Sequence, residues 1–126
     1  MKINTPISVG ELVDKITILK IKSEFITDKE KLNNILFELK NLNDVYKTIN
    51  VDLTELESNL YDVNKCLWEI EDNIRIKEKK KDFDGVFIAL ARDVYQTNDK
   101  RFELKNKINQ LTNSSIKEEK SYESYS

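Results

Sequence analysis

The chain has 126 residues, with 21 lysines and arginines, 23 aspartates and glutamates, two glycines, one proline, one cysteine and no histidine. This length fits one domain with one hydrophobic core. Without histidine there is no Ser-His triad and no imidazole metal ligand. One cysteine excludes an internal disulfide and a zinc finger. Two glycines leave no Gly-rich loop to cradle a phosphate, so most named catalytic chemistries and cofactor sites are excluded.

The charge and hydropathy patterns also exclude several partners. The formal net charge is −2, and the only dense basic run is Lys77–Lys81, which argues against nucleic-acid binding. No apolar run reaches the length of a membrane span. The first seven residues lack the apolar core of a signal peptide. We therefore expect a cytoplasmic protein with no nucleic-acid or membrane partner and no cofactor.

The first predicted helix covers residues 9–26. Ser8 and Glu11 have the spacing of a capping box, which places the start of the helix just after Ser8. Apolar residues then form two stripes on roughly opposite sides of this helix. A helix that is apolar on two sides must be buried on both. It therefore lies at the centre of a bundle or also forms an oligomer interface, and we expect a homodimer. The stripes are Val9, Leu12, Ile16 and Leu19, and Ile18, Ile21 and Phe25.

The second and third predicted helices share one apolar pattern. A second capping box at Thr27–Glu30 begins the second helix, and Asp52 with Glu55 begins the third. Alternating spacings of three and four give a heptad seam, which fits a long antiparallel hairpin. The seam residues are Leu32, Ile35, Leu39, Leu42, Tyr46 and Ile49, then Leu53, Leu56, Leu60, Val63, Leu67, Ile70 and Ile74.

A turn at Asp82–Gly85 leads into the fourth predicted helix, and a polar tail begins at Asn113. No β-type alternation of useful length occurs. The pattern predicts an all-α fold, an antiparallel bundle of about four helices over residues 1–112 with a tail over 113–126. Ile116 and Tyr122 give the tail apolar side chains with which to dock on the bundle.

Polar residues interrupt the third and fourth helices in a way that a simple bundle does not need. Arg101 falls inside the apolar seam of the fourth helix, where an unpaired charge is costly. If the two helices form a hairpin about residues 82–85, several polar side chains meet at one level. The predicted ligand-binding residues are Asn64, Trp68, Glu71, Asp72, Arg75, Arg92, Tyr95, Asn98, Asp99, Arg101 and Lys105.

Three interpretations of this cluster stay open. In the first, the cluster is a buried ion-pair network that fixes helix register in a non-catalytic structural or adaptor protein. In the second, it is a pocket for a small phosphorylated or carboxylated metabolite, in which arginine forks bind the anion and, in an enzyme, Glu71 and Asp72 supply acid–base chemistry. In the third, it is a Mg²⁺ site like that of all-helical nucleotide pyrophosphohydrolases, although only Glu69 and Asp72 match that pattern. We favour the anionic pocket, without a metal.

Four blocks of the sequence resemble a small bacterial family known only as a domain of unknown function. They are Ile7–Leu19, Val63–Arg75, Ala91–Arg101 and Glu118–Tyr122, so the resemblance covers nearly the whole chain. It implies signature positions at Gly10, Glu11, Asp14, Lys15, Asn64, Trp68, Glu71, Asp72, Arg75, Arg92, Tyr95, Asn98, Asp99, Arg101 and Glu119–Tyr122. The resemblance brings no activity. A weaker similarity to helical chorismate mutases serves only as an analogy for anion binding between helices.

Overall fold

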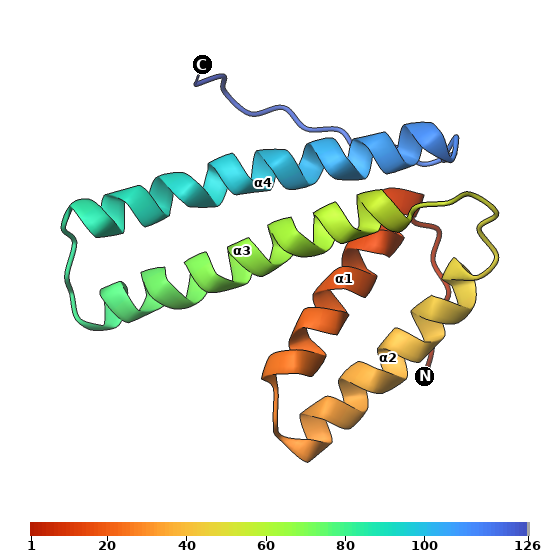
Figure 1. The fold of residues 1–126 in the computed structure, drawn as a ribbon, viewed down its shortest axis with the longest axis horizontal. Coiled ribbons are helices and arrows are strands. Elements are labelled where there is room, and N and C mark those ends of the chain that lie inside the picture. Colours follow the sequence, from red (N-terminus) through yellow and green to blue (C-terminus); the bar gives the residue numbers. More distant parts are fainter. Residues whose placement is uncertain (126) are drawn as a thin grey trace.

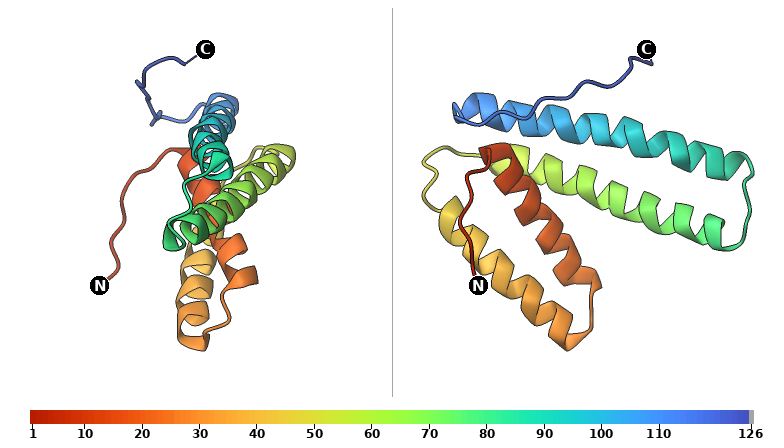
Figure 2. Two further views of the ribbon diagram at one scale, coloured as in Figure 1. Left: turned by 90° about the vertical axis from the view of Figure 1, so that its left-hand side faces the viewer. Right: turned by 180° about the vertical axis from the view of Figure 1, so that it is seen from behind.

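The computed structural model describes residues 1–125, and these form four α-helices without a strand. The helices are α1 (Val9–Phe25), α2 (Lys29–Tyr46), α3 (Thr54–Lys79) and α4 (Gly85–Leu111). They form two helical hairpins, α1–α2 and α3–α4, and the first crosses one end of the second at an angle (Figure 1). The predicted all-α fold is confirmed, but the long hairpin expected from the second and third helices is wrong, because α3 packs along α4 and α2 packs along α1. The helices of the α3–α4 pair lie side by side in all three ribbon views (Figures 1 and 2).

Local signals in the sequence explain where the helices begin. Ser8 accepts a hydrogen bond from the Glu11 amide, and Asp84 accepts one from the Phe87 amide, so both are N-caps. The expected cap at Thr27 is wrong by one residue, because Asp28 caps α2 through the Lys31 amide. The expected cap at Asp52 is also wrong by one residue, because Leu53 is the N-cap of α3. Asp52 instead accepts hydrogen bonds from the amide and the hydroxyl of Thr54.

Helix α1 lies at the centre of the fold. It packs against α2, α3 and α4, which explains why it is apolar on two sides. Val13 of α1 joins Leu53, Leu60 and Ile108 in the hydrophobic core. Contacts within one chain therefore bury most of both apolar stripes without a second copy, although Phe25 at the end of the second stripe is 47% exposed. The homodimer stays a prediction.

The polar tail turns back at the end of α4 and runs beside that helix (Figures 1 and 2). Asn113 follows the C-cap residue Thr112 and adopts a positive φ of 51°, a left-handed conformation that asparagine tolerates and that commonly ends a helix. Ser114 is buried and accepts a hydrogen bond from the Val9 amide. The tail is thereby anchored where α1 begins and α4 ends.

Candidate functional site

A buried ion pair joins α1 to α4. Asp14 is fully buried, and Arg101 donates to it through Nε, 2.9 Å from Oδ1, and through Nη2 to Oδ2. These bonds to Asp14 raise the pKa of the Arg101 guanidinium, although burial opposes its charge. A charge-assisted bidentate pair of this kind fixes both partners in orientation as well as in distance.

Two neutral side chains complete the shell of Asp14. The Asn64 amide donates from Nδ2 to Asp14 Oδ1 at 2.8 Å and to Thr17 Oγ1 at 2.9 Å. Thr17 Oγ1 donates to the Asp14 carbonyl at 2.8 Å. We call Asp14, Thr17, Asn64 and Arg101 the inner network. Both carboxylate oxygens of Asp14 are thereby hydrogen-bonded, as burial of a charge requires.

Lys105 lies one helical turn after Arg101 on α4 and forms ion pairs with three carboxylates. Its Nζ is 2.7 Å from Glu11, 2.7 Å from Glu118 and 3.9 Å from Asp14. Only 6% of its side chain is exposed. Burial disfavours its charge, but hydrogen bonds to Glu11 and Glu118 outweigh burial and raise the pKa of the Lys105 ammonium. One of these carboxylates comes from the tail, which links the buried site to the surface.

The close approach of α1 to α4 beside Lys105 depends on a glycine. The Gly10 amide donates to Asn109 Oδ1 at 2.7 Å. A Cβ at position 10 would lie 2.5 Å from the Lys105 carbonyl oxygen, a backbone atom that cannot rotate away. Only glycine therefore fits there.

The tail makes a second set of polar contacts nearer the middle of α4, before Lys105 in the sequence. Lys120 Nζ lies 2.8 Å from Asp99 and over the rings of Phe102, at 5.3 Å, and Tyr122, at 5.2 Å. The Tyr125 hydroxyl donates to Asp99 at 2.6 Å. Hydrogen bonds from Lys120 and Tyr125 lower the pKa of the Asp99 carboxyl. We call the contacts of Glu118, Lys120 and Tyr125 with α4 the outer network.

A groove of about 1020 Å³ separates α4 from the tail, and we call it the tail groove. Side chains of both signs line it together with four aromatic rings. Arg101 uses two of its five N–H donors on Asp14, which leaves three without a partner within residues 1–125. Such a surface can bind charged groups and stack on a ring. The lining residues are Val94, Tyr95, Asn98, Asp99, Arg101, Phe102, Lys105, Glu118, Lys120, Tyr122, Glu123, Ser124 and Tyr125.

Six of the predicted site residues lie in these networks or line the groove. Asn64 belongs to the inner network, and the other five, all on α4, line the tail groove. The five are Tyr95, Asn98, Asp99, Arg101 and Lys105.

The other five predicted residues lie elsewhere. Arg75 is 78% exposed and pairs with Glu71 at 3.1 Å on the surface of α3. Trp68 stacks on Phe25 of α1, with ring centroids 5.6 Å apart. Asp72 and Arg92 are exposed. The expected convergence of three arginines between α3 and α4 is therefore absent: Arg75 and Arg92 are exposed, and Arg101 pairs with Asp14 of α1.

Residue-level reasoning missed three acidic residues that complete the site. Asp14 and Glu11 lie in line with the second apolar stripe of α1, one and two turns before Ile18, and Glu118 is in the tail. The spacing of Glu11, Asp14 and Thr17 at i, i+3 and i+6 was the available signal, since it places polar groups on one side of a buried helix. No group of three or more Cys, Asp or Glu side chains in the described residues could hold a metal ion.

The sequence comparisons give a family without an activity. A model of the Family of unknown function (DUF6165) matches residues 1–125, so the chain belongs to this family. Neither the curated proteins nor the solved structures contain a match to the chain. None of the helices in residues 1–125 is long and apolar enough to cross a membrane.

Proposed function

We propose that this DUF6165 protein binds a small anionic ligand, a phosphorylated or carboxylated metabolite, in the tail groove. The observation that carries the proposal is the position of Lys105, a buried cation at the edge of the groove that is bound by a carboxylate from the tail. Glu11 and Asp14 belong to the packed α1 helix, whereas Glu118 is 40% exposed on an irregular segment. A ligand can therefore replace Glu118 without disturbing the core.

Arg101 supports the same assignment. Its side chain is 30% exposed and lines the groove while Asp14 holds its guanidinium in place. A preoriented guanidinium with spare N–H donors suits carboxylate or phosphate oxygens. The rings of Tyr95 and Phe102 add an apolar wall for the rest of the ligand. Glu71 and Asp72 lie outside the groove, so we propose binding and no acid–base step.

The second candidate function is a structural or adaptor bundle whose polar network only fixes helix register. The inner network favours it, because Asp14 is fully buried and is held by Asn64 and Arg101. The two candidates differ in what they require of the outer network. Ligand binding requires an open groove beside the buried Lys105, whereas a structural network does not.

Calorimetric titration of the full chain with inorganic phosphate, succinate and citrate at constant ionic strength tests the proposal. We expect at least one to bind, and Lys105→Gln to weaken it about 10- to 100-fold, as expected for a lost charged hydrogen bond. Lys107→Gln is the matched control, because Lys107 is exposed on the same helix. Absence of binding, or equal losses in both variants, would contradict the proposal.

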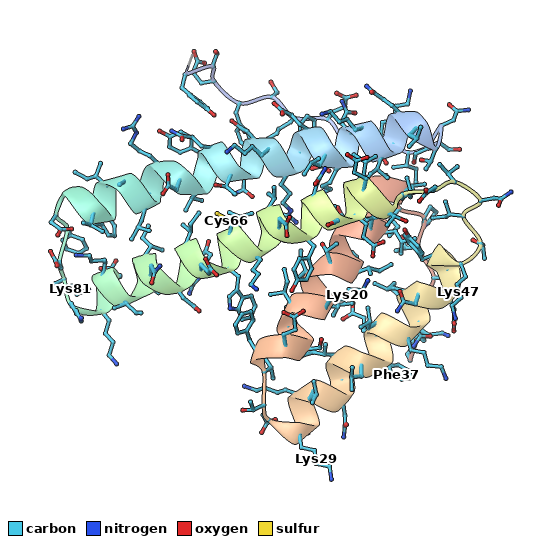
Figure 3. The ribbon with its side chains drawn as sticks, in the orientation of Figure 1. Lys20, Lys29, Phe37, Lys47, Cys66 and Lys81 are labelled. Carbon is cyan, nitrogen blue, oxygen red and sulfur yellow. The ribbon has the colours of Figure 1, made fainter. Side chains whose placement is uncertain are left out.

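We also propose a cytoplasmic location and a homodimeric state. Cys66 lies on α3 as an exposed free thiol, which fits a reducing compartment (Figure 3). A dimer would use a surface other than α1, which is central in the single chain. Light scattering of the purified chain tests the dimer, and the mass of a monomer at every concentration would contradict it.

A further inference from the structure

We propose that the ligand of the tail groove carries a cationic group as well as an anionic one, and that Glu118 and Lys120 of the tail occupy the two positions when the ligand is absent. This inference rests on the proposed function, which assigns the anionic group to Lys105. It adds a second recognition point at Asp99 and narrows the ligand class to a zwitterion.

The pairing of charges beside the groove favours the second group. Without the tail, Glu11 keeps Lys105 and Lys15 as partners and Asp14 keeps Arg101, whereas Asp99 loses its cation. Asp99 pairs only with tail residues within the described chain, namely Lys120 and Tyr125. A purely anionic ligand that displaced the tail would leave Asp99 without a cation and would add a like charge nearby. A ligand with an ammonium group would restore the lost pair.

The environment of Asp99 already holds an ammonium. Lys120 Nζ is placed between the Asp99 carboxylate and the face of Phe102, with Tyr122 on the tail side. A carboxylate beside aromatic faces is a favourable site for an organic cation. Asp99 and Phe102 both belong to α4, so this half of the site remains when the tail moves away.

The tail also indicates the separation of the two charges. Glu118 and Lys120 are two residues apart in a segment without helix or strand, and extended chain places such side chains about 7 Å apart on one side. Asp99 and Lys105 are separated by six residues of helix, a rise of about 9 Å. Asp99, Phe102 and Lys105 recur at intervals of three, which puts them on one side of α4. A ligand whose charges lie about 7–9 Å apart matches both groups.

Simple ω-amino acids test the inference in the full chain. The probes are 6-aminohexanoate and 8-aminooctanoate, with hexanoate and hexylamine as controls that carry one charge each. We expect an amino acid to bind at least about tenfold more tightly than hexanoate, since each charged hydrogen bond contributes that much. Asp99→Asn should remove this advantage without weakening hexanoate binding. The double variant Glu118→Gln with Lys120→Gln should raise the affinity for the amino acids about tenfold. Lys117→Gln should not, because Lys117 is exposed.

The outcomes separate this inference from the proposed function. If hexanoate binds as tightly as the amino acids and Asp99→Asn has no effect, the cationic position is wrong while anion binding at Lys105 stands. If the double tail variant binds no better than Lys117→Gln, the tail is not a competitor and the inference is overturned. If no carboxylate or phosphate binds to any variant, the proposed function itself fails.

Discussion

The inner and outer networks use the same kinds of charged groups but differ in which part of the chain supplies the partners of α4. In the inner network, Asp14 comes from a central helix and is fully buried against Arg101. In the outer network, Glu118 and Lys120 come from a tail that lies on the surface of α4. A pair between packed helices breaks only if the fold is disturbed, whereas a pair with a tail can exchange. The first kind stabilises register and the second leaves room for a ligand.

The largest effect should follow from removal of the inner carboxylate. Asp14→Ala leaves the Arg101 guanidinium without its partner, and loss of one member of a buried pair costs about 3–5 kcal/mol. Glu71→Ala is the matched control, because Glu71 pairs with an exposed arginine, and it should change the free energy of unfolding by less than about 0.5 kcal/mol. Urea denaturation measures both. Equal decreases in the free energy of unfolding would show that the inner network contributes no more than an exposed ion pair.

A smaller effect is expected at the contact between α1 and α4. Gly10→Ala places a methyl group 2.5 Å from the Lys105 carbonyl oxygen, so the helices must separate. Such overpacking typically costs about 1–3 kcal/mol. Gly85→Ala is the control, because a Cβ there meets nothing within 4 Å. Thermal unfolding compares them, and a Gly10→Ala protein as stable as the Gly85→Ala protein would contradict the close approach.

Changes in the outer network should affect the tail and leave the fold intact. Lys120→Gln removes the ion pair with Asp99 and the contact with Phe102. Because partly exposed pairs contribute little, we expect the docking equilibrium of the tail, followed by the amide resonances of residues 118–125, to fall only about two- to fivefold. Lys117→Gln should leave it unchanged, since Lys117 is exposed. A loss of global stability after Lys120→Gln would place the tail in the core network.

Acid should release the tail before it unfolds the helices. Asp99 has a pKa below its ordinary value of 3.8 because Lys120 and Tyr125 stabilise the carboxylate. Its contribution is therefore present above pH 3.8 and is lost as the pH falls through the lower folded-state pKa. Amide resonances of Tyr122 and Tyr125 recorded from pH 5 to pH 2 should report this step, which Asp99→Asn should remove. An unchanged transition in that variant would contradict the assignment to Asp99.

The helices could be predicted from the sequence because their signals are local. The capping residues Ser8 and Asp84 and the heptad spacing of α3 and α4 act within one or two turns. Even the errors were local, since the cap of α2 is Asp28 rather than Thr27. The two apolar sides of α1 also predicted its burial, but not whether other helices of the chain or a second copy would cover it.

The site was only partly predictable because its partners come from distant parts of the chain. The heptad phase identified Arg101 as a charge that needs a partner, but not that Asp14, 87 residues away, would supply it. Arg75 was expected in one cluster with Arg92 and Arg101, yet α1 crosses only one end of the α3–α4 hairpin, and Arg75 stays exposed. The tail contacts depend on a reversal at Asn113 that no periodic pattern encodes.

The central claim is that an anionic group binds Lys105 in the tail groove, and the nitrogen resonance of its side-chain ammonium tests this most directly. During titration of the full chain with phosphate, succinate and 6-aminohexanoate, we expect the Lys105 Nζ signal to shift and saturate with at least one of them. The Lys107 Nζ signal should stay in place. A Lys105 signal that none of the three shifts, or that moves only in step with Lys107, would contradict the account.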